Sequence, residues 1–162
     1  MSVQPIIQSL EKLIGLHESL LEISKQKTAV VKEGSVESLQ PLLLKERKHV
    51  QALEQAEVKR QKEVEDWVAQ HNANLENATI TGILEVINDE QTKNELEQIT
   101  ITLTKTITEL KQQEQLNQSL IQQSMQFVEL SLNMMKPSIR NLNYGGNKSS
   151  DSAERSVFDS KA

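Results

Sequence analysis

The chain has 162 residues, a length that suits one domain or one elongated helical bundle. Hydrophobic residues make up 36% of it and charged residues 25%, which is too apolar for a wholly disordered chain and lean for a compact globule. The net charge is −5 and no basic face is evident, so the sequence argues against binding to nucleic-acid phosphates.

The rarity of aromatic residues and of turn formers excludes a sheet protein. Phe, Trp and Tyr together make up 2% of the chain, and there are five glycines and three prolines. Aromatic side chains favour strands, and a sheet needs many turns. Leu, Gln, Glu, Lys and Ile dominate instead, as they do in long helices. The sequence therefore predicts an all-α fold, an elongated antiparallel coiled coil of three long helices.

The absence of cysteine excludes a disulfide framework and a thiolate metal site. The N-terminus lacks the basic region and apolar run of a signal peptide. No apolar stretch reaches the roughly 20 residues that span a bilayer. We therefore expect a cytoplasmic protein without direct membrane insertion.

Two helices are predicted in the first half of the chain, over residues 3–32 and 36–71. Both show apolar residues at spacings of three and four. Gly34 suits the end of the first helix and Ser35 the cap of the second. We expect a kink near Pro41, which lacks the backbone N–H of a helical hydrogen bond. Three charged residues follow the apolar seam of the second helix, and two readings are open: they either reach out from a loosely packed core or, as we favour, lie on a solvated face. These residues are Glu46, Glu57 and Arg60.

A break is predicted over residues 72–92, where Asn and Thr are frequent, with a short helical turn near Ile83 that covers the end of the bundle. A third long helix is predicted over residues 90–136, with its C-terminal part extending past the shorter helices. The β-branched run at residues 99–102 could indicate a strand, but the helical spacing continues through it. Gln113, Asn117 and Ser124 interrupt the apolar seam, and such a polar layer either fixes register or marks a seam that a partner completes.

The domain organisation follows from these elements. Residues 1–136 are predicted to form the helical bundle, which ends at Pro137, and residues 137–162 a flexible tail. Hydrophobic residues reappear in this tail, among them Tyr144.

No arrangement of residues indicates catalysis, and no cofactor is expected. The glycines form no phosphate-binding loop, and the three histidines lie far apart. His17 is expected to be a hydrogen-bonded, partly buried seam residue. Glu46 and His49 have the spacing used in di-iron bundles, but such a site needs a second pair as well as two further glutamates. The other two histidines have Ile14 and Val68 at the place of the glutamate, so no second pair exists. We therefore predict neither a metal site nor an enzyme.

Methionines gather near the end of the third helix, at Met125, Met134 and Met135. They either fill a core or form an adaptable apolar groove beside the tail, because methionine repacks easily around different partners. The groove interpretation predicts that an amphipathic helix of a partner lies on an apolar surface. That surface comprises Leu120, Phe127, Val128, Met134 and Met135.

Four short motifs follow one another in the third helix and the tail: Leu116-Asn117, Leu120-Ile121, Met135-Lys136-Pro137 and Tyr144-Gly145. In this order, and together with the three-helix layout of the whole chain, they resemble the FlgN family of flagellar export chaperones. The ending at residues 157–162 also resembles the tails of Gram-positive members of that family.

The resemblance implies a chaperone of flagellar type III secretion. Such a protein holds the C-terminal helical segments of the hook-associated proteins FlgK and FlgL before export. It then docks on the cytosolic domain of the export-gate protein FlhA, and the resemblance assigns the docking contact to Tyr144. The alternative interpretation is a general coiled-coil adaptor or a self-associating structural protein without an export role.

Overall fold

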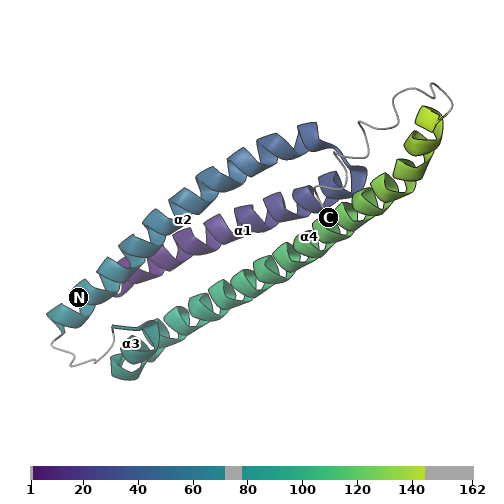
Figure 1. The fold of residues 1–162 in the computed structure, drawn as a ribbon. Coiled ribbons are helices and arrows are strands. Elements are labelled where there is room, and N and C mark those ends of the chain that lie inside the picture. The colour runs from purple at the N-terminus through teal and green to yellow at the C-terminus, as the bar shows by residue number, and fades with distance from the viewer. Residues whose placement is uncertain (1, 72–77, 145–162) are drawn as a thin grey trace, which may run out of the picture. The chain divides into compact units, whose positions relative to one another are not determined.

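A computed structural model describes residues 2–71 and 78–144, with side chains as far as residue 136. This part of the chain contains four helices and no strand: α1 (Gln4–Glu33), α2 (Val36–Gln70), α3 (Ile80–Val86) and α4 (Glu90–Tyr144) (Figure 1). The all-α prediction is confirmed, as is the short helical turn between the long helices. The chain divides into two units, Met1–Ile121 and Gln122–Ala162, and α4 runs through both.

The turn between α1 and α2 forms as predicted. Gly34 adopts the left-handed conformation, with φ of 72°, and its N–H donates to the carbonyl of Val31 at 3.2 Å. Glycine suits this position because it has no Cβ to oppose a positive φ. The Ser35 side chain then accepts a hydrogen bond from the N–H of Ser38 at 3.3 Å and caps α2. This short connection makes α1 and α2 an antiparallel pair (Figure 1).

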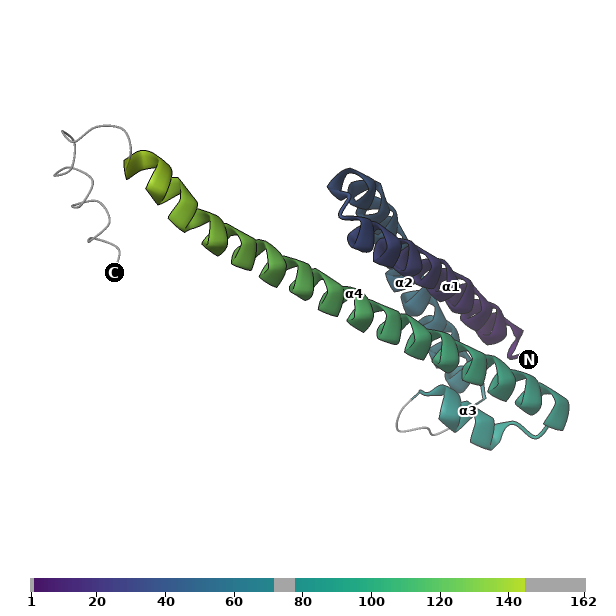
Figure 2. The ribbon, with the colours of Figure 1, turned by 90° about the vertical axis from the view of Figure 1, so that its right-hand side faces the viewer.

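The apolar core of the first unit lies where α1 begins, α2 ends and α4 begins. Both views place α3 beside the first turns of α4 at this end (Figures 1 and 2). Ile83 of α3 is fully buried there, which confirms that the short helix covers the end of the bundle. The buried members of this core are Val3, Ile6, Ile7, Leu10, Leu13, Ala56, Val64, Trp67, Ile83 and Leu96.

The β-branched stretch of α4 is helical, as the spacing of its apolar residues predicts. Five threonines at every second position donate their hydroxyl hydrogens to the carbonyls four residues earlier, at 2.7–3.0 Å. This bond satisfies the side chain within the helix, so that the crowded β-carbons do not redirect the backbone into a strand. The five are Thr100, Thr102, Thr104, Thr106 and Thr108.

The predicted C-terminal end of the third long helix needs correction. The sequence predicts an end before Pro137, whereas α4 continues through this proline to Tyr144. A proline removes one backbone hydrogen bond and crowds the preceding turn, but the residues after it can still make helical bonds of their own. Pro41 likewise lies inside α2. The part of the predicted tail that follows Tyr144 lies outside the described residues.

The core can be tested with two valines of the same helix. Val64 is fully buried and Val58 is 68% exposed. We expect Val64→Ala to lower the free energy of unfolding by about 2 kcal/mol, because it removes two buried methyl groups and leaves a cavity. Val58→Ala is the matched control and should leave stability unchanged or slightly raised, since alanine favours helix. Urea denaturation followed by circular dichroism measures both, and equal effects would contradict this placement of the core.

Candidate protein-binding site

One face of α4 points into the first unit along a seam with alternating spacings of three and four residues. Its buried and half-buried members are Leu96, Ile99, Leu103, Thr106, Leu110, Gln113, Asn117 and Leu120. The seam begins with apolar residues in the core and carries polar ones at Gln113 and Asn117. These polar residues and the stretch of α4 that follows the seam are the candidate functional features.

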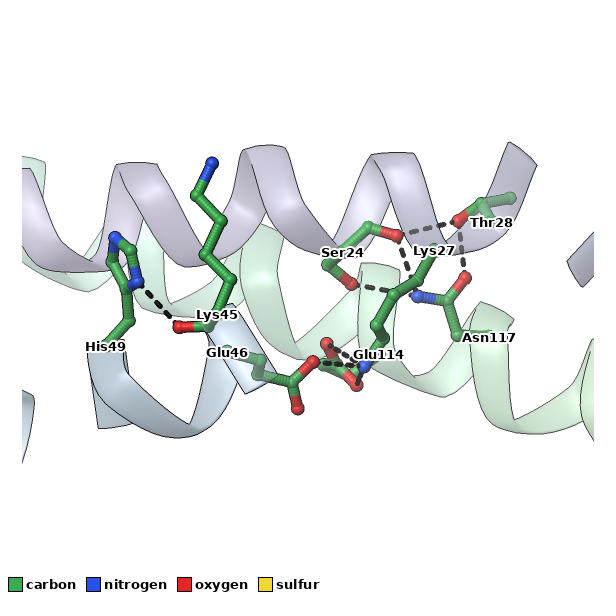
Figure 3. Close-up of polar contacts among 8 residues, drawn as sticks. All are labelled: Ser24, Lys27, Thr28, Lys45, Glu46, His49, Glu114 and Asn117. Carbon is green, nitrogen blue, oxygen red and sulfur yellow. Dashed lines mark hydrogen bonds and ion pairs between the residues drawn. The ribbon is translucent and has the colours of Figure 1, made fainter. Parts of the chain in front are cut away.

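Asn117 lies at the centre of a buried hydrogen-bonded cluster between α1 and α4 (Figure 3). Its Nδ2 donates to the carbonyl and to the hydroxyl of Ser24, each at 2.9 Å. The hydroxyl of Thr28 donates to Oδ1 of Asn117 and accepts from Nε2 of Gln113 at 2.6 Å. The predicted polar layer therefore exists at Gln113 and Asn117, and it ties two successive turns of α1 to α4.

Lys27 connects all three long helices beside this cluster. Its Nζ lies 2.6 Å from Oε2 of Glu46 in α2 and 3.2 Å from both carboxylate oxygens of Glu114 in α4 (Figure 3). Burial opposes the charge of Lys27, but the hydrogen bond to Glu46 and the charges of both carboxylates outweigh it and raise the pKa of this lysine. We call Ser24, Lys27, Thr28, Glu46, Gln113, Glu114 and Asn117 the polar cluster.

The polar cluster corrects one sequence-based interpretation. Glu46 is directed toward Lys27 and is not on a solvated face, whereas Glu57 is exposed and pairs with Arg60 at 2.5 Å, as the solvated-face interpretation predicts. Sequence reasoning missed Lys27 itself. The signal that could have found it is the charge of Glu46 at a core-like position, because a buried carboxylate needs a cation nearby.

Each of the three histidines lies within hydrogen-bonding distance of a backbone carbonyl of the preceding helical turn. Nδ1 of His17, His49 and His71 lies 2.8–2.9 Å from the carbonyl oxygen four residues earlier. For His17 this hydrogen bond and its partial burial confirm the prediction. In the described part of the chain, no group of three or more His, Asp or Glu is placed to hold a metal ion. Nor does any described helix have the length and apolar character that crossing a membrane requires.

The sequence-predicted binding residues all lie on α4. Leu120 is half-buried, whereas Phe127, Val128, Met134 and Met135 are exposed, Phe127 to 70%. Tyr144 is the last residue of the helix, and its side chain lies outside the described part.

Three further exposed apolar residues accompany this predicted surface: Met125, Leu130 and Leu132. Between Glu114 and Lys136 the sole charged residue is Glu129. We call residues 122–136 the apolar segment of α4. A stretch this apolar and this free of charge is unusual on a protein surface, and such surfaces mark sites of association.

Removal of the central lysine tests the polar cluster. Lys27→Met would leave Glu46 and Glu114 facing each other without a cation. We expect the free energy of unfolding to fall by about 1–3 kcal/mol, less than for a fully buried pair because both carboxylates are partly solvated. Lys25→Met, at an exposed position of the same helix, is the control and should have little effect.

The pH dependence of this difference follows from the raised pKa of Lys27. A cation whose pKa is raised by folding contributes its full stabilisation below the unfolded value of 10.5 and loses it as the pH rises through the folded value. The stability gap between the natural protein and Lys27→Met should therefore be constant near pH 8 and shrink above about pH 10.5. A gap that widens at alkaline pH would contradict the geometry of Lys27.

Comparison with known proteins identifies the family. The FlgN protein family matches residues 1–152 of this chain. An uncharacterised protein of Bacillus subtilis (strain 168), YvyG, is 33% identical over 165 residues, and the match covers all of both chains. No solved structure matches. The family match spans most of the sequence. The chain belongs to the FlgN family, a family of flagellar export chaperones.

Proposed function

We propose that this protein is a cytoplasmic chaperone of flagellar type III export that binds the C-terminal helical segments of FlgK and FlgL. By covering these segments it prevents premature assembly and keeps the substrates ready for the export gate. The observation that carries the proposal is the apolar segment of α4. It exposes seven large hydrophobic side chains and one carboxylate over residues 122–136.

The apolar segment suits a helical substrate. Its exposed side chains recur at the three- and four-residue spacings through which helices pack against each other. Three of the seven are methionines, whose flexible side chains adapt to different partners, and this would allow one surface to take two related substrates. The arrangement favours a hydrophobic interaction over an ionic one, because most of the charged residues of the chain lie elsewhere.

Delivery to the export gate is proposed to use Tyr144. This residue ends α4, eight residues after Lys136, and is the single tyrosine of the chain. A lone aromatic side chain can dominate a small interface. Its position beyond the apolar segment would allow FlhA to be bound while the substrate occupies the helix.

Co-expression with full-length and shortened substrates tests substrate binding. We expect FlgK and FlgL to co-purify with this protein, and we expect removal of their C-terminal helical segments to abolish the complex. Other domains of the same substrates serve as the internal control, because they are unchanged in the shortened forms. If the shortened substrates bind equally well, the proposed mode of binding is wrong. If neither full-length substrate binds, these proteins are not its clients, which would favour the general adaptor.

Substitution of the tyrosine tests the division between the two contacts. Tyr144→Ala should leave the affinity for FlgK unchanged and weaken binding to the cytosolic domain of FlhA at least tenfold, because the anchoring ring is lost. Tyr144→Phe keeps the ring and separates its contribution from that of the hydroxyl. Isothermal titration calorimetry with each partner gives both affinities. A similar loss toward both partners would argue against separate contacts.

A further inference from the structure

The apolar segment differs from the preceding part of α4 at positions beside the seam. Lys111 and Gln118 flank the seam on one side within the first unit, and Met125 and Leu132 occupy the same heptad position further along the helix. On the other side, one heptad position carries Glu109, Leu116, Gln123 and Leu130, so polar and apolar residues alternate there. Exposed large hydrophobic side chains are therefore denser after residue 121: residues 122–136 carry seven, whereas residues 96–121 carry four, Ile101, Ile107, Leu116 and Ile121.

The width of this face can be compared with that of the packed seam. At 3.6 residues per turn, the seven exposed apolar side chains of the apolar segment span about 220° of the helix circumference. Over residues 96–120 the buried and half-buried side chains, which face α1 and α2, span about 160° on the same scale. Ile101, Ile107 and Leu116 are further apolar residues of this stretch and stay exposed. A helix that packs against one neighbour needs an apolar stripe only about 100° wide. The apolar segment thus offers more surface than one partner helix can cover.

The exposed side chains form two ridges along the helix. The first ridge comprises Met125, Val128, Leu132 and Met135, and the second comprises Phe127, Leu130 and Met134. Each ridge has the alternating spacing of three and four residues that packs against one helix. Ser124 and Ser131 lie between the ridges, seven residues apart. The hydroxyl of Ser131 donates to the carbonyl of Phe127 at 2.8 Å, so this small side chain is satisfied within the helix.

Gln123 precedes Phe127 by four residues and lies in line with the second ridge. The remaining surface of the segment is a narrow polar stripe: Gln122, Gln126, Glu129, Asn133 and Lys136. Both charged residues of the segment lie on it, so the two ridges and the serines between them carry no charge. A charged partner surface would lose its hydration on the ridges and find no opposite charge there, which is unfavourable. The ridges therefore call for apolar partner faces, and the stripe is the part that stays in water.

We propose that the apolar segment of α4 binds a pair of apolar-faced helices supplied by the export substrate, one on each ridge. This proposal rests on the proposed chaperone function and specifies the kind of substrate structure that the site accepts. A second copy of the apolar segment would contribute one helix and leave the other ridge in water. One helix from the substrate would do the same. Two helices bury both ridges and leave the polar stripe exposed.

The absence of cysteine makes the arrangement measurable by thiol protection. Each single-cysteine variant carries one reactive thiol, so Val128→Cys reports on the first ridge, Leu130→Cys on the second and Gln126→Cys on the polar stripe. The alkylation rate with maleimide is compared for the free chaperone and for its purified complex with full-length FlgK. We expect at least tenfold slower alkylation on both ridges and little change at Gln126→Cys.

The outcomes separate this inference from the proposed function. Protection of one ridge alone would overturn the pair of helices and leave substrate binding by α4 intact. Unchanged rates on both ridges in a verified complex would move the substrate elsewhere. Light scattering should find one chaperone per substrate, and a complex with two chaperone copies would mean that the second helix comes from this chain. Failure of FlgK and FlgL to form any complex would overturn the proposed function itself.

Matched leucine substitutions provide an independent test. Leu130 and Leu132 lie on different ridges and are 59% and 56% exposed, while Leu44 of α2 is 57% exposed. We expect Leu130→Ser and Leu132→Ser each to weaken FlgK binding at least tenfold, and Leu44→Ser to leave it within twofold. All three side chains are exposed, so circular dichroism should report an unchanged fold. A loss confined to one of the two α4 variants would contradict the use of both ridges.

Discussion

The buried amide of Asn117 determines how α4 packs on α1. Both of its hydrogen-bonding ends are occupied by α1 side chains or carbonyls from two adjacent turns, at Ser24 and Thr28. A shift of α4 along α1 by one turn would bring Leu120 or Gln113 to this place and leave buried polar groups unpaired. Each unpaired group costs about 1–3 kcal/mol, whereas apolar side chains tolerate a shift far more easily. Lys27 adds a second constraint, because it must reach Glu46 and Glu114 at once.

The polar cluster separates two kinds of apolar surface. On one side lies the core of the first unit, where α3 and the ends of the long helices bury their apolar side chains. On the other side along α4 lies the apolar segment, whose hydrophobic side chains are exposed. The cluster contributes less stability than an apolar layer of the same size would, but it defines the point at which α4 changes from a core helix to an exposed one. Buried core side chains and exposed apolar side chains thereby lie on different parts of the same helix.

Sequence reasoning was most successful where one residue type determines the local backbone. Gly34 and Ser35 located the turn between α1 and α2, because a left-handed residue and a side-chain cap have few alternatives. Prolines were less informative: Pro137 falls inside α4, because the loss of one hydrogen bond does not end a long helix. Lys27 was missed because its importance depends on two carboxylates that are 19 and 87 residues away in the sequence. Spacing within one helix cannot reveal such a partner.

The parallel packing of α1 and α4 also has a consequence for the order of folding. The hydrogen bonds between these helices join residues 85–93 positions apart, whereas α1 and α2 meet through a short turn. Closing so long a loop is entropically costly. We therefore expect the hairpin of α1 and α2 to form faster than the packing of α4 on it. During synthesis the hairpin leaves the ribosome well before Asn117, and until then Ser24, Lys27 and Thr28 lack their partners on α4. The contacts of Gln113, Glu114 and Asn117 with α1 are therefore among the last that synthesis makes possible in the first unit.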